Sequence, residues 1–391
     1  MENSFVHLHA HTEYSMLDGA AKIEPFLNRI LELEQPGAAI TDHGNLYGAL
    51  EFYNSAIKKK LKPIIGYEAY VISDSRFERP DRKNNKRYHL TLLAENTVGY
   101  WNLVEMASKA FTEGYYYKPR IDYELLKKYS EGIIALSGCL GGEIAQLLAP
   151  DGSVEEGNQG QTRSFDDALK KAEFYQSIFG ENNFFIELHK HGIKQQEDIL
   201  PDLLKISEKL SAPLVATNDS HYVHFDDASA HDALLCVQTN ATLDDENRFK
   251  FDGSGFYIKS SEEMRDLFPN EKFPDACNNT LKILDRVEYE FEKDTYYLPD
   301  FPIDDSSKNV DEYLKEKVYQ GAESLYGELS SELEERINYE LEVIESMGFA
   351  SYFLIVGDLI NYAKSNGIRT GAGRGSAAGS IVSYCLGITG I

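Results

Sequence analysis

The chain has few cysteines and no long apolar run. Its four cysteines, Cys139, Cys236, Cys277 and Cys385, lie far apart and none forms a Cys-x-x-Cys pair. This spacing argues against a disulfide framework and favours a reducing, cytoplasmic environment. A membrane-spanning helix needs about 18 or more consecutive apolar residues, and no such stretch is present. The first residues also lack the basic and apolar regions of a secretion signal. We therefore expect neither membrane insertion nor secretion.

Basic residues are also scarce, since 39 Lys and Arg stand against 64 Asp and Glu, giving a formal net charge of -25. Proteins that hold DNA over a broad surface are normally basic, because neutralising phosphates supplies much of the affinity. Basic residues cluster only locally, at 58–62 and 79–87. The acidity is compatible with a protein that binds divalent cations. It is also compatible with a protein whose polynucleotide binding is carried out by parts not present in this chain. Most of the charges are expected to form a solvated surface.

Short apolar runs alternate with stretches of helical spacing through the first 220 residues. The runs expected to be strands are 5–6, 38–40, 64–65, 88–93, 133–136, 184–188 and 214–216. Helical spacing is found at 23–33, 49–60, 100–111, 166–179 and 195–210. Such alternation predicts an α/β fold with parallel strands. Seven strands could close into a barrel, with functional residues where strands end.

The length of 391 residues predicts more than one domain. The polar stretch 151–164 reads as an exposed loop. A break near 273–279 divides an α/β domain, 1–275, from a mainly helical region, 276–391. In the second region, 297–302 is too proline-rich for a helix, and 310–326 and 331–347 show helical patterns.

Residues able to bind metal follow most of the expected strands. His9 and His11 are alternate residues, so on a strand both imidazoles share a face and can reach one ion. Asp219 and His221 repeat this spacing. Glu68 could bridge two ions with its two oxygens. Together these residues predict one pocket that holds several metal ions.

Other histidines have less specific positions. His7 could hydrogen-bond a ligand residue, and Glu187, His189 and His191 share a strand face that could form a rival site. His224 and His231 are expected at the surface.

The motifs His9-Ala10-His11-Thr12, Thr41-Asp42-His43-Gly44, Gly66-Tyr67-Glu68 and Asp219-Ser220-His221 resemble those of the polymerase-and-histidinol-phosphatase (PHP) domain family. The resemblance implies a seven-stranded (β/α) PHP barrel with two or three divalent ions, Zn, Mn or Mg. It implies catalytic roles for His9, Glu68 and Asp219, and Cys139 as a thiolate ligand would favour zinc. The implied metal ligands are His9, His11, Asp18, His43, Glu68, His89, Cys139, Asp219 and His221.

The segment 367–387 is rich in glycine and serine and contains no Walker motif. A helix is expected after Ser376, so loop and helix N-terminus could bind phosphate; close helix packing through small residues is the alternative. With residues 347–356, the segment resembles the palm domain of the bacterial DNA polymerase III alpha-subunit family. That resemblance implies that Arg374, Gly375 and Ser376 contact the triphosphate of an incoming nucleotide.

The family's polymerase chemistry uses Mg²⁺ held by an Asp-x-Asp pair downstream of this loop, and no such pair occurs in the chain. We therefore expect an N-terminal fragment with a complete PHP domain and an incomplete palm, without polymerase activity. The resemblance implies DNA, deoxynucleoside triphosphates, a sliding clamp and a proofreading subunit as partners of the full-length protein. For the PHP domain it suggests a 3′–5′ proofreading exonuclease. The alternatives are a free-standing phosphoesterase, or a structural metal cluster that docks a separate proofreading subunit.

Overall fold

The computed structural model describes residues 3–81, 84–150, 162–251, 255–291, 297–303, 308–373 and 375–391. The chain divides into two compact units, Met1–Glu290 and Phe291–Ile391. The expected loop at 151–164 lies mostly outside the described residues.

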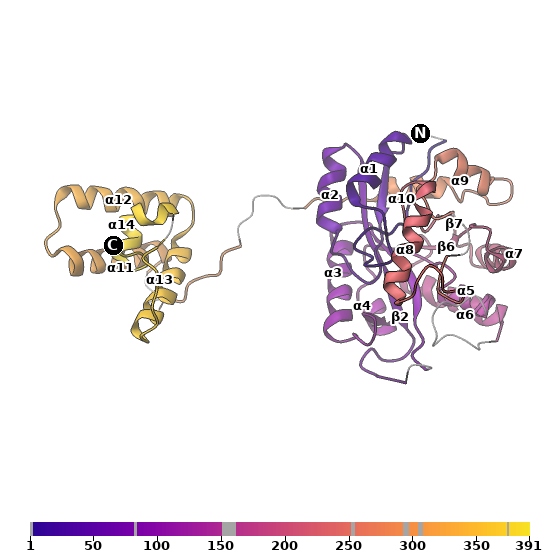
Figure 1. The fold of residues 1–391 in the computed structure, drawn as a ribbon, viewed down its shortest axis with the longest axis horizontal. Coiled ribbons are helices and arrows are strands. Elements are labelled where there is room, and N and C mark those ends of the chain that lie inside the picture. Colours follow the sequence, from indigo (N-terminus) through magenta and orange to yellow (C-terminus); the bar gives the residue numbers. More distant parts are fainter. Residues whose placement is uncertain are drawn as a thin grey trace. The chain divides into compact units, whose positions relative to one another are not determined.

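The first unit is built on a seven-stranded sheet in the order β1-β2-β3-β5-β6-β7, with β4 paired to β2. The strands are β1 (Gly37–Ile40), β2 (Lys62–Ile72), β3 (Tyr88–Ala94), β4 (Arg120–Asp122), β5 (Ile133–Leu136), β6 (Phe184–Leu188) and β7 (Leu214–Ala216). Helices line both sides of these strands, with those between residues 23 and 128 on one side and those between residues 143 and 210 on the other (Figure 1).

Residues 7–11 connect the two ends of the sheet. The amide of Ala39 donates to the carbonyl of His7 at 2.7 Å, and the amide of His11 donates to the carbonyl of Ser220, beyond β7, also at 2.7 Å. The segment thus lies between β1 and the residues after β7. It closes the sheet into the predicted barrel, although it forms isolated bridges rather than the regular strand expected at 5–6.

One expected feature of the sheet is wrong, because β3 runs antiparallel to both β2 and β5. The other pairs, β1–β2, β2–β4, β5–β6 and β6–β7, are parallel. A parallel neighbour needs a long crossover, usually a helix, but no helix lies in the described residues between β2 and β3. The short strand β4 was not expected from the sequence.

Helices cover the outside of the barrel, and those at 23–32, 49–58, 97–112, 165–179 and 194–210 form where the apolar spacing predicted them. The first of them buries an apolar stripe of Phe26, Leu27 and Ile30. The helices of this unit are α1 (Ile23–Glu32), α2 (Ala49–Lys58), α3 (Thr97–Thr112), α4 (Tyr123–Lys128), α5 (Glu143–Leu148), α6 (Phe165–Phe179), α7 (Lys194–Leu210), η3 (Phe225–Asp227), α8 (Ala228–Thr239), α9 (Ser261–Leu267) and α10 (Asn278–Arg286).

Helix α10 explains why the first unit extends to residue 290 rather than 275. Its Ile283 and Leu284 share a buried cluster with strand residues such as Ile64 and Ile134. Asn279 also donates its side-chain amide to the carbonyl of Leu214 at 2.7 Å. The helix therefore belongs to the core of the barrel, 15 residues beyond the expected boundary (290 against 275).

The second unit is helical, with α11 (Val310–Tyr326), α12 (Ser331–Ser346), α13 (Ala350–Ser365), η4 (Gly375–Gly379) and α14 (Ile381–Cys385). Its core contains Leu314, Val318, Ile337 and Val382. No single helix in the described ranges is long and apolar enough to cross a membrane; only α12 and α13, joined at a 114° bend, reach that length and composition together.

Candidate metal centre

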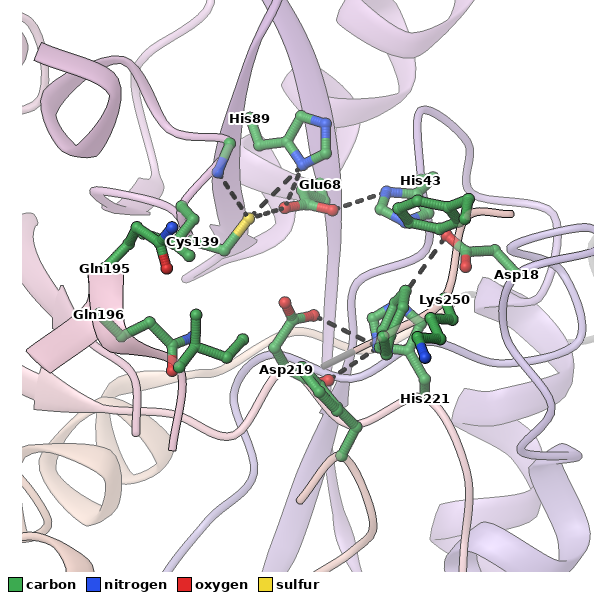
Figure 2. Close-up of a pocket in the computed structure, with 16 residues that line it drawn as sticks. Asp18, His43, Glu68, His89, Cys139, Gln195, Gln196, Asp219, His221 and Lys250 are labelled. Atoms are coloured by element: carbon green, nitrogen blue, oxygen red, sulfur yellow. Dashed lines mark hydrogen bonds and ion pairs between the residues drawn. The ribbon is translucent and has the colours of Figure 1, made fainter. Parts of the chain in front are cut away.

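The residues predicted to bind metal converge at one end of the barrel, where they come from seven separate segments of the chain. Figure 2 shows the pocket that they surround, which has a volume of about 390 Å³. His9 and His11 are fully buried beneath it. The members that line the pocket itself are Asp18, His43, Glu68, His89, Cys139, Asp219 and His221.

The direction of β3 explains the position of His89. A residue near the start of a parallel strand would lie at the opposite end of the barrel from the other candidates. Because β3 is antiparallel, its first residues lie beside the last residues of β2, where His89 pairs with Tyr70. His89 Nδ1 consequently lies 3.0 Å from the carboxylate of Glu68.

His9, His11 and Asp219 form the deepest part of the cluster. Asp219 Oδ1 lies 3.4 Å from His9 Nε2 and 3.1 Å from His11 Nε2. All three atoms are buried and have no hydrogen-bond partner among the described residues. Two atoms that each bind one ion at about 2.1 Å, at a tetrahedral angle, lie roughly 3.4 Å apart. The three atoms therefore fit a metal ion, which would also satisfy them.

The carboxylate of Glu68 lies between the two parts of the cluster. Its Oε1 is 3.4 Å from His9 Nε2, and its Oε2 is 2.6 Å from His43 Nδ1. The Cys139 thiol lies 3.5 Å from Oε1 and 3.6 Å from the His89 ring. One carboxylate thus reaches both sides of the cluster, which is the arrangement of a bridging ligand.

A third group forms around Asp18, in the loop before α1. Its Oδ2 accepts a hydrogen bond from His43 at 2.8 Å and lies 3.8 Å from His221 Nε2. The glycine after His43, Gly44, has a φ of +66°. A Cβ there would lie 2.7 Å from Pro119, so both the backbone and the space require glycine.

The backbone of Asp219 is also constrained, with a φ of +42° that residues other than glycine rarely adopt. The side-chain amide of the preceding Asn218 donates to the carbonyls of Gly255 and Tyr257, at 2.9 and 2.8 Å. These bonds hold the turn that directs the Asp219 carboxylate toward His9 and His11. Unfavourable backbone conformations of this kind persist where the surroundings enforce them.

The charges of the cluster depend strongly on each other. Burial lowers the pKa of His9, but the carboxylates of Asp219, Glu187 and Glu68 outweigh it and hold that pKa well above its ordinary value. Burial, together with the His43 and His221 rings, lowers the pKa of His11 to about 3.

The acidic groups respond in the opposite way. Burial raises the pKa of Glu68, but three neighbouring imidazoles lower it well below its ordinary value. The pKa of Asp219 is likewise held well below its ordinary value, because neighbouring histidines outweigh burial. Burial and the charge of Glu68 raise the pKa of the Cys139 thiol. Both carboxylates are therefore anionic and attract cations.

Two buried carboxylates that the sequence did not assign to the cluster support it from behind. Glu187 Oε1 lies 2.7 Å from His9 Nδ1, on the opposite side of the ring from Asp219. Asp42 accepts a hydrogen bond from Ser15 Oγ at 2.7 Å, and Ser15 Oγ lies 2.9 Å from Nδ1 of His11. Such partners fix the orientation of metal-binding side chains.

The remaining histidines differ in part from their expected roles. His7 hydrogen-bonds the carbonyl of Lys259 rather than a candidate ligand. The two ring nitrogens of His191 bond Asn218 O and Gln196, so His191 does not join the rival site. Glu187 and His189 do lie together, but they group with His9 instead. His224 is exposed as predicted.

His231 was expected at the surface and is instead buried. Its Nε2 hydrogen-bonds the carbonyl of Asp18 at 2.8 Å, and its ring lies 5.6 Å from that of His221. Helix α8 carries this residue beneath the pocket. Its sequence position gives no signal for this role, because the contact depends on how α8 packs.

The glycine-rich segment in the second unit is only partly described, because Arg374 lies outside the described residues. Gly375 and Ser376 are exposed in the short 3-10 helix η4. The helix expected after Ser376 begins only at Ile381. The side chain of Glu340 binds the first turn of this helix. It accepts hydrogen bonds from Ser380 Oγ at 2.8 Å and Val382 N at 3.1 Å. A protein carboxylate therefore occupies the place that a phosphate would take at this helix.

Sequence comparisons agree with this geometry. The PHP domain family matches residues 7–191, and the family described as the bacterial DNA polymerase III alpha NTPase domain matches residues 312–391. The fold and the cluster at the end of its barrel thus define the first unit as a PHP domain.

Relatives match both units together. DNA polymerase III subunit alpha of Borreliella burgdorferi is 44% identical over 99% of this chain and 33% of its own length. The corresponding subunit of Mycobacterium tuberculosis is 46% identical over 100% of this chain and 33% of its own length. The alpha subunit of Thermus aquaticus is 40% identical over 99% of this chain and 36% of its own length. The chain belongs to the family of bacterial DNA polymerase III alpha subunits and spans about a third of the length of these relatives.

Similarity to solved structures is weak. An amidohydrolase from Chromobacterium violaceum aligns with a TM-score of 0.35 at 12% identity, covering 56% of this chain and 88% of its own.

Proposed function

We propose that the first unit is a metal-dependent phosphodiesterase that removes nucleotides from 3′ DNA ends. The observation that carries the proposal is the cluster of buried nitrogen and oxygen atoms at the barrel end, separated by distances suited to shared ions. We assign metal binding to His9, His11, Asp18, His43, Glu68, His89, Cys139, Asp219 and His221. Ions bound there would activate water and neutralise the charge of the phosphate.

In this proposal the residues around the pocket have different roles. Asp219 and Glu68 supply anionic oxygens shared between imidazoles, and His9 is held in place by Glu187. Phe251 and Phe256 give the pocket an apolar side, and electrostatic interactions beside apolar side chains are stronger than in bulk water.

We further propose that the second unit contributes to nucleotide binding in the polymerising subunit of a bacterial replicase. Gly375 and Ser376 would offer backbone and hydroxyl donors, with Arg374, to a triphosphate. In that setting the natural partners are DNA, deoxynucleoside triphosphates with Mg²⁺, a sliding clamp and a proofreading subunit, all in the cytoplasm. Family membership supports this proposal and disfavours a free-standing phosphomonoesterase.

The test combines elemental analysis with an exonuclease assay on single-stranded and mispaired ends. Asp219→Asn and His9→Ala should lose bound metal and lower hydrolysis by orders of magnitude, because each removes a ligand. His224→Ala, which changes an exposed histidine, is the matched control and should leave both unchanged. Full metal binding without hydrolysis in the unmodified chain would instead favour the structural role, a metal cluster that docks a separate proofreading subunit.

A further inference from the structure

One wall of the metal pocket is aromatic. Phe249, Phe251 and Phe256 line it together with Lys250, on the segment that follows α8. We call Phe249, Phe251 and Phe256 the aromatic wall. Neither the metal cluster nor the hydrolysis proposed for it requires aromatic rings at this place.

The aromatic wall is braced and lies directly against the cluster. Phe256 stacks on His191 with ring centroids 4.0 Å apart and an interplanar angle of 16°. Phe251 packs edge-to-face on Phe256 at 4.6 Å and on the candidate ligand His221 at 4.8 Å. A planar group bound against this wall would therefore lie beside the metal cluster.

The outer end of the wall remains accessible. The Phe249 side chain is 38% exposed, and its ring lies 5.9 Å from that of Phe251. Among the described residues that line the pocket, Lys250 alone bears a lysine or arginine charge. The neighbouring Arg248 is instead paired with Asp232 through two hydrogen bonds of 2.5 and 2.6 Å. Figure 2 shows Lys250 on the same side of the pocket as His221 and Asp18.

This combination selects a particular chemistry. Aromatic side chains stack on nucleobases regardless of sequence, and a lysine pairs with the phosphates of the strand. A small phosphomonoester without a ring would gain nothing from the wall. A ligand that carries both a flat ring and several phosphates would contact all of it.

We propose that Phe249, Lys250 and Phe251 form a subsite that binds the end of a single-stranded nucleic acid, with a base stacked on the aromatic wall and a phosphate paired with Lys250. This inference rests on the proposed function, because it takes a nucleic-acid strand as the substrate of the metal centre. It adds the residues that select such a strand over other phosphate esters.

The test measures the affinity of the full 391-residue chain for a fluorescently labelled oligothymidylate by anisotropy, at several salt concentrations. Phe249→Leu keeps an apolar side chain but removes the π face, and should weaken binding about ten-fold. Lys250→Met should weaken binding. It should also reduce the slope of the logarithm of the binding constant against the logarithm of the salt concentration by about 0.7, the value for one phosphate of a single strand. Phe225→Leu and Lys272→Met change exposed residues outside the pocket and are the matched controls.

A second measurement separates this inference from the proposed hydrolysis. The rate of removal of a normal 3′ nucleotide is compared with that of a 3′ abasic residue, which lacks the base. The unmodified chain should prefer the normal end, and Phe249→Leu should abolish the preference while retaining bound metal. Equal cleavage of both ends, with equal affinities of Phe249→Leu and Phe225→Leu, would overturn the subsite and leave the hydrolase intact. Binding that depends on Phe249 and Lys250 without any hydrolysis would support the subsite and refute the hydrolase.

Discussion

Glu187 supports the candidate metal centre without lining the pocket itself. Its carboxylate contacts His9 Nδ1 at 2.7 Å, Thr217 Oγ1 at 2.6 Å and Gly138 N at 2.9 Å. It thereby fixes the His9 ring so that Nε2 points toward Asp219. The carboxylate also increases the negative charge around the cluster, and burial does not prevent its ionisation because His9 and His189 keep its pKa well below the ordinary value.

We therefore expect Glu187→Gln to weaken metal binding about 10- to 100-fold, the usual effect of changing a residue that orients a ligand. The glutamine preserves size and one acceptor oxygen but loses the charge. Calorimetric titration of the metal-free protein with Mn²⁺ or Zn²⁺ measures the effect. Glu181→Gln, at an exposed position, is the control. An unchanged affinity for Glu187→Gln would show that Glu187 does not act on the cluster.

Buried histidines make the first unit sensitive to acid. Burial lowers the pKa of His7 from 6.5 to about 4, and burial with the nearby charge of His189 lowers that of His191 to about 3. Below pH 6.5 the unfolded chain binds protons that the folded chain excludes, so the free energy of unfolding falls as the pH falls toward 4. Above pH 6.5 this contribution is fully present.

The expected loss is about 3 kcal/mol at most for His7 between pH 6.5 and 4. Thermal unfolding in the presence of a chelator, at steps between pH 7.5 and 4.5, measures it without interference from bound metal. His7→Gln keeps a donor for the carbonyl of Lys259 but does not titrate, so its pH dependence should be flatter. Identical curves for both proteins would contradict the assignment.

At the scale of whole elements, Glu340 joins α12 to α14. Its Oε2 accepts from Ser380 Oγ and Val382 N, and its Oε1 accepts from Arg336 at 2.8 Å. Burial raises the pKa of Glu340, but these hydrogen bonds outweigh it and lower the pKa below its ordinary value. The short helix α14 depends on this carboxylate because its first amides have few other partners.

Glu340→Ala should therefore destabilise the second unit by about 1–3 kcal/mol, since it leaves buried donors unpaired. Glu342→Ala removes an exposed carboxylate from the same helix and should have little effect. Denaturant unfolding followed by circular dichroism measures both variants. Equal stabilities would show that α14 is held by its apolar contacts alone.

The sequence predicts the positions of many helices, but it does not predict the direction of every strand or the contacts between distant residues. Helices such as α11, Val310–Tyr326, follow from apolar spacing because one face packs against one core. Apolar spacing does not predict the direction of β3, because a run of buried residues has the same pattern in a parallel and in an antiparallel strand. His231 and Glu187 were assigned other roles because their contacts connect residues far apart in sequence.

At the scale of the whole molecule, the two units have separate cores and should unfold separately. The second unit has the smaller core, and α13 exposes Tyr352, Leu359 and Tyr362. We expect two calorimetric transitions, with the second unit unfolding at the lower temperature. Added divalent metal should raise only the upper transition, because ligands stabilise the state that binds them. One transition that shifts as a whole would indicate that the units are coupled.

The last prediction concerns which unit carries activity in this chain. Within its 391 residues no two aspartates are separated by a single residue, so the carboxylate pair that would hold Mg²⁺ for nucleotide transfer is lacking. We expect no templated nucleotide incorporation, measured by primer extension. Hydrolysis of 3′ ends should require added metal and fall sharply in Asp219→Asn, while Arg374→Ala should leave it unchanged. Because Asp219 belongs to the barrel and Arg374 to the second unit, the reverse result would move the chemistry from one unit to the other.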